Sequence, residues 1–424
     1  SSFVAPAAAS AIIVGMGRLL ASLLLLLTFA TPVQGGPTFI PPRTGLVAED
    51  IGLLINEDDP LSRATGAHYQ KVRRIPDGNV IRLHFTPGQS AISPDRFAAL
   101  KQQIDAETPR HVQAFAVAWT MPYRVGCMSL TSALAFGFDE RFCSRQCGRT
   151  AASPYFNAAG SYPFTEHGLR PAMMLAGHDE AAVRSLIDRG VAADSSFPAG
   201  NALLMSTSDR ARNVRAAYFE QTAKELEGVF PIEVLAADTI AAREDVLFFF
   251  TGLASVPGIE TLRFAPGALA DHLTSFGGQL TDSSQMSALR WLEAGATASY
   301  GTVTEPCNHP QKFPLPAVAM FFYAGGATAI EAYWKSVAWP GEGVFIGEPL
   351  SRPFGWQASE RSPGVWELRL HAPRPGRVHL EHARSPMGPF RPVSASRPIV
   401  RGMNRLTLTT AANSGFLRPA FTVH

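Results

Sequence analysis

Short apolar segments of strand-like composition alternate with amphipathic helical segments along most of this chain. Residues 50–55, 112–119 and 246–250 are strand-like, and residues 94–107 and 179–189 have helical periodicity. Strands that alternate with helices predict a mostly parallel sheet that is covered by helices on both faces. We therefore expect an α/β fold. Further strands are expected over residues 80–85, 171–176, 202–207, 232–235, 268–273, 296–303 and 344–346.

The sequence pattern changes after Phe354. From residue 356 onward no helical periodicity is visible, and short alternating apolar runs are separated by Pro and Gly. This pattern is typical of a small β-sandwich. We expect an α/β domain over residues 37–354, followed by a β-sandwich module over residues 355–424.

The N-terminal segment has the order of features found in a secretory signal peptide. Arg18 precedes an apolar run over residues 19–30, and small or polar residues follow as far as Gly36. The apolar run is shorter than the roughly twenty residues that a membrane-spanning helix needs. We expect residues 1–36 to be leader and signal peptide and the remaining chain to be periplasmic or extracellular. The alternative is an uncleaved membrane anchor, and no later stretch is long and apolar enough to span a bilayer.

The composition argues against nucleic acid as a partner. The formal net charge is +2 and no Lys/Arg-rich run is present, whereas nucleic-acid binding relies on clustered positive charge. An apolar content of 46% is enough for a well-packed core. No cofactor is predicted. The expected partners are a peptide, a glycan or an envelope protein.

The four cysteines are Cys127, Cys143, Cys147 and Cys307. Export permits disulfides, and Cys143 and Cys147 are close enough in sequence to be the obvious local pair. Cys127 and Cys307 would then form a long-range bridge or remain free thiols. A zinc site at Cys143 and Cys147 is the alternative, but two ligands do not complete one. Three of the cysteines lie in a Gly/Pro/Ser-rich stretch over residues 122–170, which we expect to be a long and functional excursion from the core.

Candidate site residues follow from the rule that ligands bind beyond the carboxyl ends of parallel strands. The first predicted strand is followed by Glu57, Asp58 and Asp59, whose carboxylates could hold a cation or orient a substrate. They could equally form a solvated N-cap for the next helix. Thr251 follows the apolar strand over residues 246–250 and is a catalytic candidate by the same rule.

The segment TSFGG, residues 274–278, follows another predicted strand. Gly277 and Gly278 permit positive φ and could expose backbone N–H groups that bind an anion together with Thr274. Ser275 could act as a nucleophile. The alternative is a tight structural turn, and the segment lacks the GxSxG pattern of serine hydrolases.

Glu305 and Cys307 follow the predicted strand over residues 296–303. A cysteine nucleophile needs a neighbouring base. His309 is too close in sequence to serve as that base, whereas His272 could reach Cys307 from the end of a neighbouring strand. A Cys307–His272 dyad with Glu305 nearby is therefore one hypothesis. A buried or disulfide-bonded Cys307 is the other.

Several longer motifs resemble a sporadically distributed bacterial family of exported proteins that has no assigned activity. The motifs are LTSFGG, SALRWLEAGATASYGTVTEPC and EAYWKSVAWPGEGVFIGEPLSRPF, with NEDDPLS, MPYRV and SPYFN nearer the start. The resemblance covers nearly the whole chain between the signal peptide and Phe354.

A more distant resemblance is to gingipain-type cysteine peptidases of the caspase-like clan. The similar segments are VLFFFTG, GATASYGTV and FIGEPLSRP, the last of which resembles the Gly-Asp-Pro ending of that group. This resemblance implies a caspase-like (flavodoxin-like) α/β fold. The catalytic His-Gly and Cys of such peptidases match Thr251-Gly252 and, approximately, Thr274-Ser275 here, so neither catalytic role can be carried over.

Three functions therefore compete. The first is a catalytically silent caspase-like domain that binds a peptide, glycan or surface partner. The second is a peptidase- or esterase-type hydrolase with Cys307 or Ser275 as a non-standard nucleophile. The third is an envelope-associated structural protein that acts through its C-terminal module. The missing catalytic pair favours the first.

Overall fold

The structure is a computed structural model that describes residues 36–423 of the 424-residue chain. The predicted leader and signal peptide thus lie almost wholly outside the described residues. Within the described part, no helix is both long and apolar enough to cross a membrane.

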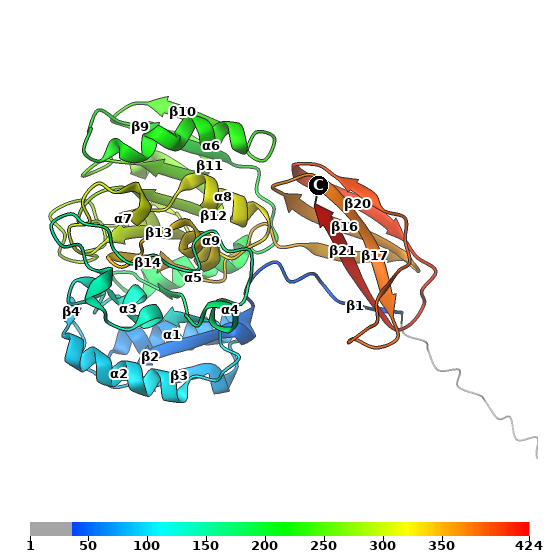
Figure 1. The fold of residues 1–424 in the computed structure, drawn as a ribbon, viewed down its shortest axis with the longest axis horizontal. Helices are drawn as coiled ribbons and strands as arrows, with labels where there is room; N and C mark the ends of the chain where they lie inside the picture. The colour runs from blue at the N-terminus through cyan, green and yellow to red at the C-terminus, as the bar shows by residue number, and fades with distance from the viewer. Residues whose placement is uncertain (1–35, 424) are drawn as a thin grey trace, which may run out of the picture. The chain divides into compact units, whose positions relative to one another are not determined.

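A ten-stranded sheet forms the centre of the α/β part, with the strand order β10-β9-β11-β12-β13-β14-β8-β5-β2-β3 (Figure 1). All of its strand pairs are parallel except β13 with β14. This confirms the predicted mostly parallel sheet. The strands are β2 (Ile51–Asn56), β3 (Val80–Leu83), β5 (Ala114–Val117), β8 (Ala172–Met174), β9 (Asn201–Ser206), β10 (Ile232–Ala236), β11 (Arg243–Thr251), β12 (Leu262–His272), β13 (Ala298–Thr302) and β14 (Gly343–Gly347).

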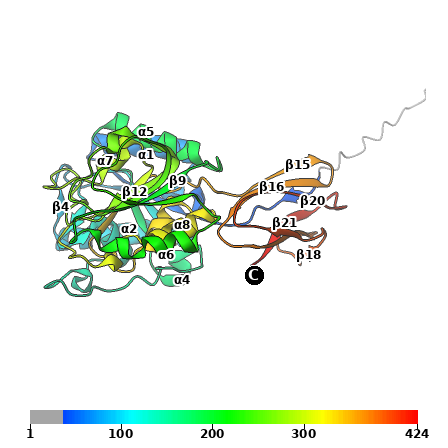
Figure 2. The same cartoon turned by 90° about the horizontal axis from the view of Figure 1, so that it is seen from above.

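Helices cover both faces of this sheet, as predicted. Figure 2 shows α1, α5 and α7 on one side and α2, α6 and α8 on the other. Asp59, Ser93 and Asp179 cap α1, α2 and α5 by accepting backbone N–H bonds, which satisfies donors that a helix start leaves free. The helices are α1 (Pro60–Arg73), α2 (Pro94–Glu107), α3 (Leu130–Phe136), α4 (Pro163–His167), α5 (Glu180–Ala193), α6 (Phe219–Glu225), α7 (Leu289–Ala294), α8 (Pro316–Ala324) and α9 (Ala329–Ser336).

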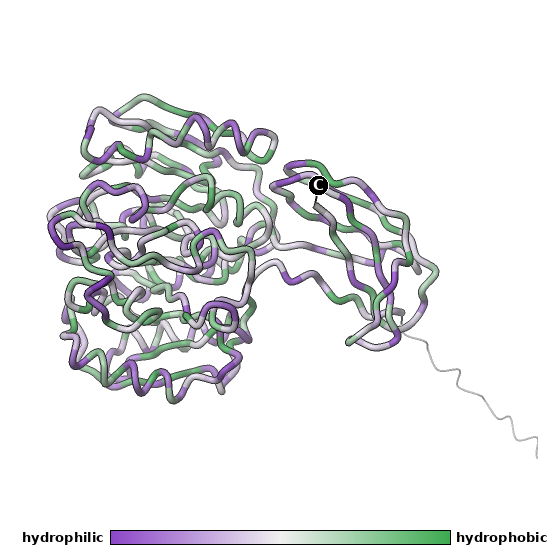
Figure 3. Tube along the Cα trace, viewed as in Figure 1, coloured by the Kyte–Doolittle hydropathy of each residue, from purple (hydrophilic) through white to green (hydrophobic). Residues whose placement is uncertain are grey.

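The central strands are buried on both faces. Val246, Leu247, Phe248, Phe249 and Phe250 of β11 are all 0% exposed. Strands of a covered parallel sheet carry continuous apolar runs because each face meets a helix layer. Figure 3 shows the hydropathy of each residue along the chain, in which apolar and polar segments alternate.

The C-terminal residues form two further sheets, as the alternating pattern indicated. One is the antiparallel sheet β15 (Gln357–Ser362), β16 (Val365–Ala372) and β20 (Gly402–Thr409). The other joins β17 (Gly376–Ala383), β18 (Arg391–Pro392), β19 (Arg397–Ile399) and β21 (Phe416–Val423) to the two-residue strand β1 (Thr38–Phe39). Both sheets contribute to one buried cluster, with Trp366 and Leu370 from one and Val378 and Leu380 from the other. The arrangement is β-sandwich-like.

The segment over residues 122–170 was predicted to leave the core as a long loop, but part of it packs into the core. Its helix α3 is buried almost throughout and packs against the large sheet, so it belongs to the core. The excursion also forms β6 (Arg124–Val125) and β7 (Met128–Ser129), which make a small sheet with β4 (Ala91–Ile92).

Candidate functional site

Several hollows lie beyond the carboxyl ends of the parallel strands, and two of them are lined by residues that the sequence predicted. The first, which we call the α2 pocket, has a volume of about 840 Å³ and follows β2 and β3 along helix α2. The second, the disulfide pocket, has a volume of about 350 Å³ and follows β9, β12 and β13. The α2 pocket is lined by Asp58, His84, Phe85, Thr86, Gln89, Ala91, Ile92, Ser93, Arg96, Ala99, Leu100, Gln103 and Pro122. The disulfide pocket is lined by Cys147, Ala211, Arg212, Leu273, Thr274, Ser275, Glu305, Pro306, Cys307, Asn308 and Phe313.

The three acidic residues after β2 engage different partners and do not act as one cluster. Asp58 lines the α2 pocket, and its Oδ1 lies 2.9 Å from His84 Nδ1. Glu57 accepts a hydrogen bond from Arg82. Asp59 accepts the Leu61 N–H and caps α1. No three potential metal ligands gather anywhere in residues 36–423. These three carboxylates therefore do not form a cation site in the described residues.

The predicted Cys143–Cys147 pair is wrong. Cys143 is bonded to Cys127, and Cys147 is bonded to Cys307. The reason lies in the tertiary structure. The fold places the excursion against the segment that follows β13, so Cys147 bonds Cys307, which is 160 positions away, and not its neighbour Cys143. Two disulfides fit an exported protein.

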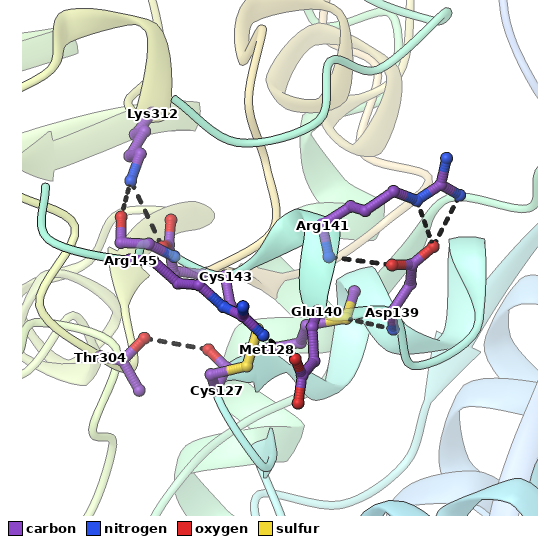
Figure 4. The surroundings of a disulfide bond; sticks show 11 residues. Cys127, Met128, Asp139, Glu140, Arg141, Cys143, Arg145, Thr304 and Lys312 are labelled. Atoms are coloured by element: carbon purple, nitrogen blue, oxygen red, sulfur yellow. Dashed lines mark hydrogen bonds and ion pairs between the residues drawn. A yellow bond between two sulfur atoms is a disulfide. The ribbon is translucent and has the colours of Figure 1, made fainter. Parts of the chain in front are cut away.

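The Cys127–Cys143 bridge is embedded in a network that ties the excursion to the sheet (Figure 4). Thr304 donates its hydroxyl to the Cys127 carbonyl at 2.9 Å. The buried Lys312 bonds Ser144 and lies 3.3 Å from Glu342. Burial lowers the pKa of Lys312, whereas the negative charge of Glu342 acts to raise it.

The hypothetical Cys307–His272 dyad is also wrong. Cys307 has no free thiol, because it is disulfide-bonded. His272 is 0% exposed, its Nδ1 accepts the Trp291 indole N–H at 2.9 Å, and its Nε2 bonds the Met286 carbonyl at 3.1 Å. Burial lowers the pKa of His272 to about 3. The imidazole is a neutral core group and not a base at the surface.

Thr251 is likewise a structural residue. It is 1% exposed, and its hydroxyl donates to the Met205 carbonyl at 2.9 Å. Its own carbonyl accepts a bond from Arg215, which forms a fully buried ion pair with Asp271 at 2.6 Å. Burial raises the pKa of Asp271 to about 6, although Arg215 acts in the opposite direction. The Thr251 hydroxyl is thus buried and engaged by a backbone carbonyl.

Four sequence-predicted residues do come together, because Thr274, Ser275, Glu305 and Cys307 all line the disulfide pocket. Glu305 Oε1 accepts the Cys307 N–H at 2.8 Å. No histidine lines this pocket in the described chain, so Ser275 has no imidazole base there.

Sequence reasoning missed Arg212, which also lines the disulfide pocket. Its Nε donates to Thr274 Oγ1 at 3.0 Å, and its Nη1 pairs with Asp209 at 2.9 Å. Arg212 follows the carboxyl end of β9, so the rule that selected the other residues could have found it.

Gly277 and Gly278 do not form the expected anion cradle. Neither has a positive φ, and the Gly278 N–H is used by the Thr302 carbonyl at 2.9 Å. A Cβ on Gly278 would lie 2.5 Å from the Gly301 carbonyl oxygen, and one on Gly301 would lie 2.4 Å from the Gly277 carbonyl carbon. Glycine is required because two backbone segments touch, which leaves no room for a side chain.

Replacing Gly278 by alanine should lower the free energy of unfolding by about 3 kcal/mol, at the upper end of the usual range for overpacking, because the clashing atoms are backbone. Urea denaturation followed by tryptophan fluorescence measures the change. Gly78→Ala is the matched control, since its Cβ would meet nothing within 4 Å and its φ is ordinary. Equal stability of the two variants would contradict the close-contact explanation.

Comparisons with protein-family models, with curated proteins and with solved structures found no match for this chain.

Proposed function

We propose that this protein is a caspase-like α/β protein that has lost the catalytic pair and acts by binding a short extended peptide. One observation carries the loss of catalysis: the cysteine candidate Cys307 is held in a disulfide, while the histidine candidate His272 is buried against Trp291. A nucleophile and a base within reach of each other are the minimum for covalent acyl transfer.

The strand order supports the caspase-like class. The sheet has two halves with the same strand order, β3-β2-β5-β8 and β10-β9-β11-β12. In each half the first strand along the chain lies second from the edge, the second strand forms the edge, and the third pairs with the first on its other side. Two doubly wound halves followed by a β-rich module also fit the resemblance to gingipain-type peptidases. Thr251 and Thr274-Ser275 take the places of the catalytic residues in that resemblance.

The α2 pocket is the proposed binding site. Its volume of about 840 Å³ lies in the range of ligand sites. The strand β4 lines it through Ala91 and Ile92 and, among the described strands, pairs only with β6. Because β4 has one edge without a partner strand in the described chain, an extended peptide in the pocket could continue the ladder by main-chain hydrogen bonds, which favours a peptide as the ligand.

The side chains of the α2 pocket fit a peptide of mixed character. Phe85 and Leu100 offer apolar surface, and the Asp58–His84 pair and Arg96 offer charged groups of both signs. Alternate side chains of an extended peptide would meet these two kinds of surface in turn.

The test is selection of a random heptapeptide phage library against the folded protein. Selected peptides should bind the wild type and should bind Ala99→Trp at least about tenfold more weakly, because an indole at Ala99 fills the pocket. Ala106→Trp is the matched control: Ala106 is exposed on the same helix but does not line the pocket. Binding is measured by fluorescence anisotropy of the labelled peptide.

Two outcomes would overturn the proposal. If no peptide is enriched, or if Ala99→Trp binds as well as Ala106→Trp, the α2 pocket is not a peptide site. If mass spectrometry finds the peptides cleaved and Ser275→Ala abolishes the cleavage, the serine hydrolase is the correct function.

A further inference from the structure

We propose that the Cys147–Cys307 disulfide is a thiol-exchange site: a dithiol reductant enters the disulfide pocket and opens this bond in the folded protein, while Cys127–Cys143 stays closed. The inference does not depend on peptide binding at the α2 pocket. It starts from the fact that both cysteines of the bond line a hollow at the functional edge of the sheet.

The two disulfides differ in access. Cys147 is exposed and Cys307 is half-buried, and both line the disulfide pocket. Cys143 lines a different hollow, of about 410 Å³, but is only 8% exposed and belongs to a core cluster against which the half-buried Cys127 packs, so the contrast in access rests on the exposed Cys147. Exchange requires a thiolate to reach a sulfur atom, so access separates labile bonds from structural ones.

The backbone at the two disulfides also differs. Cys147 and Cys307 have φ of 60° and 58°, and the neighbouring Gln146 has φ of 47°. Left-handed conformations cost a non-glycine residue about 1–2 kcal/mol and persist where the surroundings enforce them. Cys143 has an extended φ of −103°, and Cys127 is not among the positive-φ residues. Opening Cys147–Cys307 would let residues 146, 147 and 307 relax, which favours its reduction over that of the other bond.

The chemistry balances with a dithiol as the electron donor. Its thiolate attacks Sγ of the exposed Cys147, a new S–S bond forms, and Cys307 leaves as a thiolate that takes a proton from water. The second sulfur of the reductant, as a thiolate, then attacks the first sulfur of the reductant in the mixed disulfide. Cys147 leaves as a thiolate and also takes a proton from water. The dithiol is oxidised to a disulfide by two electrons, and the protein gains two thiols.

The charges around the bond predict a selectivity for the attacking thiol. Glu305 is exposed, and its Oε1 lies 2.8 Å from the Cys307 N–H. Arg212 lines the same pocket but is already paired with Asp209. The carboxylate of Glu305 therefore repels an attacking thiolate that carries further negative charge more than one that carries only the charge of its sulfur.

The first experiment uses the folded, oxidised wild-type protein. It is treated with graded dithiothreitol without denaturant, quenched with an alkylating reagent and mapped by mass spectrometry, with circular dichroism in parallel. Cys147 and Cys307 should be alkylated at least about tenfold faster than Cys127 and Cys143 while the fold persists. The proposal is overturned if both bonds open at the same rate, if Cys127–Cys143 opens first, or if reduction occurs only with unfolding.

The second experiment tests the route through the disulfide pocket. Glu305→Gln should speed reduction by glutathione, whose thiolate carries a net charge of about −2, about threefold at low salt, and should speed reduction by 2-mercaptoethanol, whose thiolate carries about −1, less. Glu180→Gln, which removes an exposed carboxylate on α5, should change neither rate. An equal effect of Glu305→Gln on both thiols, or no effect, would show that the thiol does not enter past Glu305 and would overturn the assigned route.

Discussion

Replacing Glu348 by glutamine is expected to lower the free energy of unfolding by about 3–5 kcal/mol, the usual cost of breaking a buried ion pair. Glu348 is 0% exposed, and its two carboxylate oxygens bond Arg73 Nε at 2.9 Å and Nη2 at 2.5 Å. Arg73 also pairs with Asp194. The variant would leave a nearly buried guanidinium with only part of its compensating charge.

The geometry around Glu348 explains why the fold cannot easily adapt to its loss. A Cβ on Gly190 of α5 would lie 2.5 Å from Glu348 Cγ, so the glycine makes room for the carboxylate. The pair thus joins α1 to the end of β14 beneath α5. It also gives the FIGEPLSRP motif a structural role.

Urea denaturation of three variants tests this explanation. Removing both charges in Arg73→Met/Glu348→Gln should recover at least half of the loss, because no buried charge is then left unpaired. Glu180→Gln, which breaks an exposed pair with Arg184, should change the free energy of unfolding by less than about 1 kcal/mol. A loss for Glu348→Gln no larger than that of the control would contradict a stabilising buried pair.

Lowering the pH from 6.5 to 4 is expected to reduce the free energy of unfolding by about 3 kcal/mol net. Burial lowers the pKa of His272 to about 3 and that of His371 to about 4. The unfolded chain protonates both imidazoles near pH 6.5. Below that pH the unfolded state therefore binds more protons than the folded state does. The free energy of unfolding falls as the pH falls.

Asp271 acts in the opposite direction. Its pKa is raised to about 6 in the folded protein, against an ordinary value near 3.9. Between these values the folded state binds a proton that the unfolded state does not, so Asp271 adds stability as the pH falls. Two histidines against one aspartate leave a net loss.

A single variant separates the contribution of His272. His272→Gln keeps a donor for the Met286 carbonyl but cannot titrate, so the slope of stability against pH between 6 and 4 should fall by about 1.4 kcal/mol per pH unit. His84→Gln is the control, because His84 is exposed and is not part of the core. Urea denaturation at each pH gives the slopes. Parallel curves for the wild type and His272→Gln would show that His272 is not kept neutral by burial.

Much of the architecture was determined by the sequence itself, because local physics is decisive there. The continuous apolar run of β11 correctly predicted a strand that is covered on both faces, and the capped helix α2 occupies the predicted residues 94–107. The alternating runs after Phe354 similarly led to antiparallel strands. The two-residue strand β1 was missed, since it exists only through its pairing with β21.

The site was decided by the tertiary structure. The carboxyl-edge rule did bring Thr274, Ser275, Glu305 and Cys307 to one pocket, because parallel strands all end on the same side of a sheet. It could not tell which of the neighbouring side chains would be buried. His272 faces Trp291, and Thr251 is bonded to Met205.

The pairing of the cysteines shows the same limit most clearly. Proximity in sequence favoured Cys143–Cys147, whereas the fold places Cys147 and Cys307 with their Cα atoms 5.5 Å apart. Sequence reports which residues are neighbours along the chain. Which residues become neighbours across 160 positions depends on how the sheet, the excursion and the segment after β13 pack together, and only the folded structure settles that.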